Sequence, residues 1–315
     1  MKGPIKTSDP RHPVLPISFA AEYGTQLGRA VSLGGGGVFL IAWQTGYLST
    51  LAEGGVFISQ AERLVGTSAG SVVAAILAGG GLHRAEFQVR LLMALEPLLG
   101  VVAPSPHLNA TQQRARDLFM YASDGEPSTI RAIGHAALAA KTSGEGALRR
   151  SLALFLGRGT WSSPALHITA VDAYTGERAV FTNSSHVSTV AAAAASSSVP
   201  GVSPPQTIHG VRYMDGGVSG TGVHLDLVSG ARKVLVLTLT DGSTLDKGML
   251  TYTKESFEHE VVEIEHAGSR VLIRTPQSFD LEAIMDPSSV KEGYAMGREQ
   301  GKRDLTVVRA FWNGR

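Results

Sequence analysis

The segment Gly66-Thr67-Ser68-Ala69-Gly70 lies between a short strand-like stretch, residues 62–65, and a helix-forming stretch, residues 71–78. A chain that passes from a strand straight into a helix must turn sharply, and flanking glycines allow the backbone to do so. The pattern predicts a strand–turn–helix unit that lifts the Ser68 hydroxyl clear of the backbone at a helix N-terminus. Such a unit is a building block of α/β folds.

A second unit of this kind precedes it. Residues 30–33 form a short apolar run, the glycines at 34–37 follow, and residues 38–53 have the spacing of an amphipathic helix. Glycine amides can approach a ligand oxygen closely because no side chain intervenes. The loop matches neither the dinucleotide-binding fingerprint nor the P-loop, so a nucleotide site is a minor alternative, and close packing is another.

The rest of the chain alternates strands and helices, which predicts an α/β fold with a mostly parallel central sheet. Residues 100–160 are expected to be a helical insertion that caps the site, and residues 1–28 an extended lead-in to a domain over 29–315. The later elements expected are hairpins at 166–171 with 178–182 and at 207–208 with 211–214, strands at 233–240 and 270–274, and helices at 83–99, 186–198, 255–268 and 288–309.

Composition excludes several kinds of site. The chain has 315 residues, a net charge of +1 and no dense Lys/Arg stripe, so we expect no nucleic-acid partner. It has no cysteine, which excludes disulfides, thiolate metal sites and cysteine nucleophiles. No signal-peptide core and no run of 18 apolar residues is found, so we expect a cytoplasmic protein, with export without a cleaved signal left open.

Ser68 is a candidate nucleophile and needs a base. Asp215 ends a strand and precedes Gly216 and Gly217, so its carboxylate is expected on a tight loop facing the serine; burial would raise its pKa toward neutrality. The alternative is an aspartate that only caps the turn. A Ser–His–Asp triad would need a late histidine, and His224 is the one candidate, because His259 and His266 lie in a charged helical pattern.

Taken in order, these motifs resemble the patatin-like phospholipase family over about residues 30–240. The matching pieces are the glycine loop at 34–37 with Gly46-Tyr47-Leu48, the 66–70 elbow, Thr169-Ala170 with Thr175-Gly176-Glu177 and Val180-Phe181, Ala195-Ser196-Ser197-Ser198-Val199-Pro200-Gly201 with Pro204-Pro205, and Asp215-Gly216-Gly217.

The resemblance implies a three-layer α/β/α fold and a serine hydrolase that cleaves phospholipids or other acyl esters with no metal or cofactor. It implies that Ser68 is the nucleophile and Asp215 its base, in a dyad without histidine. The oxyanion donors would be the amides of Gly35, Gly36 and Gly37, with Ala69 as a further candidate. Peripheral membrane contact fits a lipid substrate, although no basic amphipathic helix indicates it.

Two stretches depart from the family pattern. The basic residue and glycine that usually follow the glycine loop are replaced by the apolar residues 38–41, and residues 218–224 replace the usual Asn and Pro after Asp-Gly-Gly. These departures motivate an alternative function, a lipid-binding protein of the same fold without turnover.

Overall fold

The computed structural model describes residues 27–102, 108–122, 124–157, 159–242 and 254–314. Its strands are β1 (Arg29–Leu33), β2 (Arg63–Gly66), β3 (Leu166–Asp172), β4 (Arg178–Phe181), β5 (Gln206–Ile208), β6 (Val211–Asp215), β7 (Lys233–Leu237) and β8 (Arg270–Arg274). They form one sheet with the order β5-β6-β3-β2-β1-β7-β8, and β4 pairs with β3 off this path. Strands β3, β2, β1, β7 and β8 are parallel, whereas β4 and β6 run antiparallel to β3. The predicted α/β fold with a mostly parallel sheet is therefore confirmed.

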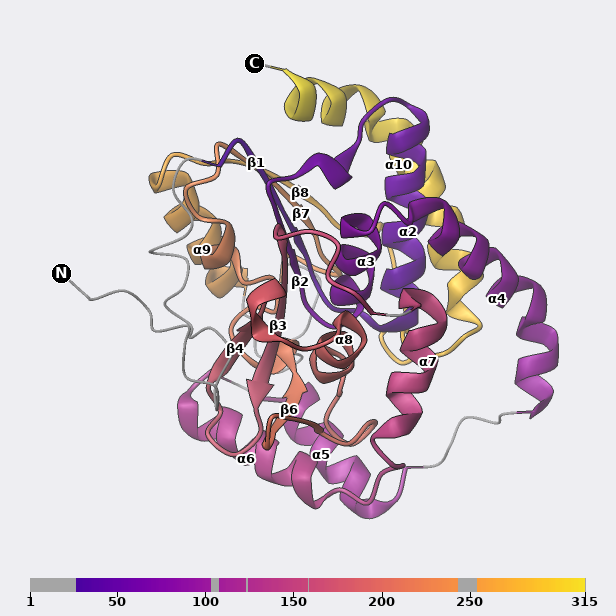
Figure 1. Ribbon diagram of the computed structural model, residues 1–315, viewed down its shortest axis with the longest axis vertical. Helices are drawn as coiled ribbons and strands as arrows, with labels where there is room; N and C mark the ends of the chain where they lie inside the picture. The colour runs from indigo at the N-terminus through magenta and orange to yellow at the C-terminus, as the bar shows by residue number, and fades with distance from the viewer. Residues whose placement is uncertain (1–26, 103–107, 123, 158, 243–253, 315) are drawn as a thin grey trace.

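Helices cover both faces of this sheet (Figure 1). They are α2 (Gly37–Glu53), α3 (Ala69–Ala78), α4 (Leu82–Val102), α5 (Ala110–Met120), α6 (Pro127–Ala139), α7 (Gly146–Leu156), α8 (Thr189–Ser196), α9 (Lys254–His266) and α10 (Ser289–Asn313). In β1, Val31 and Leu33 pack with α2, α3 and α10, whereas Ala30 packs on the opposite face with α9. Alternate strand residues thus enter two separate cores, which makes three layers.

Helix α2 differs from the amphipathic helix that the sequence predicts. It is buried on nearly every side, because it lies between the sheet and α10. The close approach of α10 depends on small residues: a Cβ at Gly297 would lie 2.2 Å from the Trp43 carbonyl oxygen, and one at Gly46 would lie 2.5 Å from that of Tyr294. The Trp43 indole also donates to the Gln300 side chain at 3.2 Å. The helix that begins at the glycine loop is therefore tightly held.

The stretch expected to be a helical insertion, residues 100–160, contains α5, α6 and α7. Helices α5 and α6 pack where β3 and β6 extend beyond the end of β2, around Val171 and Met214. Helix α7 packs against α3 and α8. That the insertion caps the site stays a prediction.

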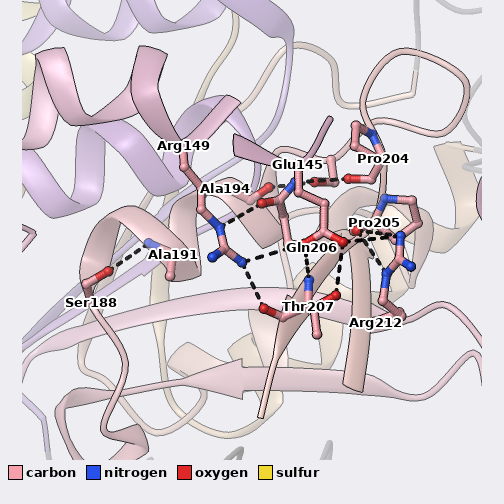
Figure 2. A network of polar contacts seen from close by, with 11 residues as sticks. Glu145, Arg149, Ser188, Ala191, Ala194, Pro204, Pro205, Gln206, Thr207 and Arg212 are labelled. Carbon is pink, nitrogen blue, oxygen red and sulfur yellow. Dashed lines mark hydrogen bonds and ion pairs between the residues drawn. The ribbon is translucent and has the colours of Figure 1, made fainter. Parts of the chain in front are cut away.

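Side chains of the α7 region complete the β5 edge of the sheet (Figure 2). Glu145 accepts from the Thr207 backbone amide at 2.9 Å, and Arg149 donates to the Thr207 carbonyl at 2.8 Å. Arg149 also donates to the Gln206 side chain at 2.8 Å. Because an edge strand leaves backbone groups unpaired, these side chains take the place of a neighbouring strand.

Several element boundaries differ from those predicted. Helix α8 is shorter because residues 183–185 form a separate 3-10 turn and the Ser188 hydroxyl caps the helix at the Ala191 amide. Strand β7 ends at Leu237, and α10 continues to Asn313 because Phe311 and Trp312 are buried in the core. Residues 1–26 of the predicted lead-in lie outside the described residues. No helix in the described ranges is both long and apolar enough to cross a bilayer.

Candidate active site

Ser68 occupies the turn between β2 and α3 in a backbone conformation that side-chain-bearing residues rarely adopt. Its φ is 52° and its ψ is −121°, which costs on the order of 1–3 kcal/mol and persists only when surrounding contacts impose it. On either side of it, the Thr67 amide donates to the Leu33 carbonyl at 3.0 Å and the Gly70 amide donates to the Gly34 carbonyl at 3.1 Å. The turn is thus tied to the end of β1, and the Ser68 side chain is held at the start of α3.

The glycines around Ser68 are required by close backbone contacts. A Cβ at Gly70 would lie 2.0 Å from the Leu33 carbonyl oxygen, and one at Gly66 would lie 2.6 Å from that of Gly70. Neither position has room for a side chain. The G-x-S-x-G pattern therefore reflects the packing of this turn against β1 as well as its sharpness.

Asp215 is the last residue of β6 and pairs with Ala170 of β3. Its side chain is buried, with 2% exposed. Oδ1 accepts from the Gly217 amide at 2.8 Å and so caps a short 3-10 helix, η4 (Gly216–Val218). Oδ2 is buried and accepts no hydrogen bond from the described residues. One carboxylate oxygen thus holds the turn, and the other has a lone pair available.

Burial raises the pKa of Asp215 to about 7, against the opposing effects of the Gly217 amide and the Ser68 hydroxyl. Because the Ser68 hydroxyl stabilises the charged carboxylate, the two side chains lie close to each other. Gly216 lets the turn after Asp215 lie against β3: a Cβ there would lie 2.5 Å from Oγ1 of Thr169, whose hydroxyl pairs with that of Thr67 at 2.7 Å. The arrangement brings a hydroxyl to a carboxyl that changes protonation near neutral pH.

The glycine loop lies against Ser68. A Cβ at Gly35 would lie 3.0 Å from the Ser68 Cβ and 3.6 Å from its Oγ. Gly37 has a φ of +63° and starts α2, so the amides at this helix end lack intrahelical acceptors. Within the described ranges, no acceptor is found for the amides of Gly35, Gly36 and Gly37 or for that of Ala69. Gly35, whose amide is one of these, therefore lies beside the serine, and Ala69 directly follows it in the chain.

The region that carries these elements also matches a known family. Residues 31–226, which include Ser68 and Asp215, match the patatin-like phospholipase family. The chain belongs to this family. Membership supports a lipid acyl hydrolase in general terms.

Two solved structures show a distant likeness to this patatin-like chain. VipD from Legionella pneumophila is 12% identical, with 89% of this chain and 67% of that chain covered and a TM-score of 0.42. The type III effector protein ExoU is 18% identical, with 89% and 53% covered and a TM-score of 0.36. The patatin-like chain spans about half the length of the ExoU chain, and no curated protein matches its sequence.

The apolar residues that replace the family's basic residue take part in packing. Phe39 and Leu40 are buried in the main core. The Phe39 amide donates to the Ile284 carbonyl at 3.1 Å, and a Cβ at Gly37 would lie 2.3 Å from the same oxygen. A distant segment of the chain is thus seated directly on the start of α2.

His224, the histidine considered for a triad, is buried and engaged at both ring nitrogens. Nε2 faces the Gly216 carbonyl at 3.0 Å, and Nδ1 faces the Arg178 guanidinium at 2.7 Å. Burial, reinforced by Arg178, lowers its pKa to about 3. A neutral ring that donates to Gly216 and accepts from Arg178 has no lone pair left for a serine proton, so the triad alternative is not supported. His259 and His266 are exposed, as predicted.

Sequence reasoning did not assign two contacts to this site. Ser196 accepts from the Ser68 amide at 2.8 Å, and Arg178 pairs with Asp226 while it contacts His224. Ser196 belongs to a motif noted in the sequence, but its partner lies far away in the chain. Among the described residues, no cluster of His, Asp and Glu side chains has the geometry to hold a metal ion.

Proposed function

We propose that this patatin-like protein hydrolyses acyl esters of phospholipids or related lipids through a Ser68–Asp215 dyad. The observation that carries the proposal is a strained, glycine-flanked serine whose hydroxyl stabilises a buried carboxylate, and that carboxylate's Oδ2 has no other partner among the described residues. Family membership supports the lipid substrate class. The proposal requires no histidine and no metal.

In the proposed reaction, the Ser68 Oγ attacks the ester carbonyl carbon while its proton passes to Asp215 Oδ2. The carbonyl oxygen becomes an oxyanion that accepts hydrogen bonds from the amides of Gly35, Gly36 and Gly37, with Ala69 as a further donor. The C–O bond to the alcohol breaks, and that alcohol takes the proton from Asp215. Asp215 then accepts a proton from water, the hydroxide attacks the acyl-enzyme, and the proton returns to Ser68 as the fatty acid leaves.

A carboxylate can serve as the base because its environment makes it basic enough. With a pKa of about 7, Asp215 is deprotonated in a large fraction of molecules near neutral pH and still holds a proton well enough to return it. An exposed aspartate would be too weak a base by about three pH units.

The function is tested by incubating the full chain with a fluorophosphonate probe and a p-nitrophenyl acyl ester. We expect ester hydrolysis, its loss on labelling, and a single adduct on Ser68 by mass spectrometry; heat-unfolded protein is the control and should not label. An unlabelled folded protein that still binds phosphatidylcholine vesicles would contradict the proposal and establish the lipid-binding alternative.

A phospholipid bilayer is the proposed source of substrate, and the surface formed by α4 and α7 is the proposed contact. Arg84, Phe87 and Leu91 share one side of α4 by their spacing. The Gln88 side chain donates to the Leu154 carbonyl, which places Leu154 of α7 beside them. Phe87 is 65% exposed and Leu154 is 71% exposed, so large apolar side chains gather next to an exposed cation.

Replacing both Phe87 and Leu154 with serine is expected to weaken vesicle binding about tenfold, since burying two such side chains in lipid contributes more than 1.4 kcal/mol. Co-sedimentation with vesicles of mixed phosphatidylcholine and phosphatidylglycerol measures this. Phe57→Ser is the matched control, because Phe57 is 49% exposed and lies against the C-terminal end of α10. Equal binding by the double variant and the control would exclude this surface.

A further inference from the structure

The end of α8 contacts both members of the proposed dyad. The Ser196 hydroxyl oxygen accepts from the Ser68 backbone amide at 2.8 Å, and the Ser198 carbonyl accepts from the Asp215 backbone amide at 3.0 Å. Ser196 and Ser198 are both completely buried. A single short stretch of chain is therefore bonded to the nucleophile's backbone and to the base's backbone.

This stretch is itself firmly held. The Ser198 hydroxyl donates back to the Ala194 carbonyl at 2.7 Å, which fixes the chain as it leaves the helix. Helix α8 packs on β3 and β6, the strands that carry Thr169 and Asp215. Ser197, between the two contacts, has a buried hydroxyl with no hydrogen-bond partner among the described residues. Ser196 and Ser197 are thus adjacent serines of which only the first has a hydroxyl that accepts from the Ser68 amide.

We infer that Ser196 is a positioning residue that sets the separation and orientation of Ser68 relative to Asp215; this rests on the proposed function. A residue with a φ of 52° is strained and relaxes unless its peptide groups are anchored. The Ser196 hydroxyl anchors the peptide group that precedes the Ser68 Cα and so fixes the direction of its side chain. Because the Ser198 carbonyl holds the Asp215 amide from the same stretch, one segment of chain positions both catalytic groups relative to each other.

The kinetic test compares Ser196→Ala with Ser197→Ala in the full chain. A misplacement of the order of 1 Å costs up to about 100-fold in rate, so we expect Ser196→Ala to lower kcat by about 10- to 100-fold with KM within about twofold of wild type. Ser197→Ala removes an equally sized hydroxyl that holds nothing, and its kcat is expected to stay within about twofold. Equal kcat values for the two variants would overturn the inference.

A second measurement is independent of turnover. The hydrogen exchange of the Ser68 amide, followed by NMR on serine-labelled protein, should be accelerated at least about tenfold by Ser196→Ala and unchanged by Ser197→Ala, since only the first loses the acceptor. A wild type that shows this exchange pattern but no hydrolysis would contradict the proposed function and still support the anchoring of the Ser68 amide by Ser196. Unchanged exchange in Ser196→Ala would remove the anchoring even if the wild type is active.

Discussion

Ser68→Ala is expected to reduce ester hydrolysis by at least about 10³-fold, because removing a nucleophile leaves only binding and oxyanion stabilisation to act on the substrate. The fold should remain, since the turn is held by backbone hydrogen bonds, from the Thr67 amide to Leu33 and from the Gly70 amide to Gly34, that the substitution leaves in place. Initial rates on a p-nitrophenyl ester measure the loss of activity, and circular dichroism and thermal unfolding on the same samples show whether the fold remains.

The control for Ser68→Ala is Ser197→Ala, which removes from the same region a buried serine hydroxyl that has no partner in the described part of the chain. It should hydrolyse the ester at close to the wild-type rate. Wild-type turnover by a folded Ser68→Ala protein would show that the nucleophile lies elsewhere.

Asp215→Asn is expected to reduce hydrolysis by about 10³-fold or more, because an amide cannot accept the serine proton. The same substitution should raise stability above pH 7. Asp215 has a pKa of about 7 when folded and 3.8 in its ordinary environment, so folding favours the protonated form and the native state loses stability as pH rises from about 4 to about 7. An asparagine avoids this buried charge and still accepts from the Gly217 amide. We therefore expect the free energy of unfolding of Asp215→Asn at pH 8 to exceed that of the wild type by about 2–4 kcal/mol.

Two pH series test this assignment. For the wild type, kcat/KM should rise about tenfold per pH unit below about 7 and level off above it, since the free enzyme needs a deprotonated base. The melting temperature of Asp215→Asn should exceed that of the wild type at pH 8, and the difference should shrink toward pH 5. A wild-type acid limb near pH 4, or an asparagine variant less stable at pH 8, would contradict the environment described for Asp215.

The α/β class and the strand–turn–helix unit at Ser68 could be predicted because they depend on local patterns. Glycines on both sides of a serine, with a strand before and a helix after, describe a turn that few other conformations satisfy. Boundaries were less predictable. Helix α2 has an amphipathic spacing in sequence yet is buried on nearly every side, because Gly46 and Gly297 allow α10 to close over the side that the pattern leaves open to solvent.

For the candidate site too, the sequence predicted some features and the packing decided others. Sequence order pointed to Ser68 and Asp215 and left His224 open as a rival base. Only the packing decides against His224, because the Gly216 carbonyl and Arg178 occupy both ring nitrogens and Arg178 comes from another strand. Likewise, a pKa near 7 for Asp215 depends on burial by residues distant in the chain.

By itself, the sequence determined the family, the fold class and the two side chains proposed for acyl transfer, because glycines, strand patterns and chemical groups are local properties. Tertiary structure alone decided that burial raises the pKa of Asp215, that its Oδ2 accepts no hydrogen bond from the described residues, and that Ser196 accepts from the Ser68 amide. Those properties are set by burial and by hydrogen bonds between distant segments, and residue spacing along one chain does not encode such contacts.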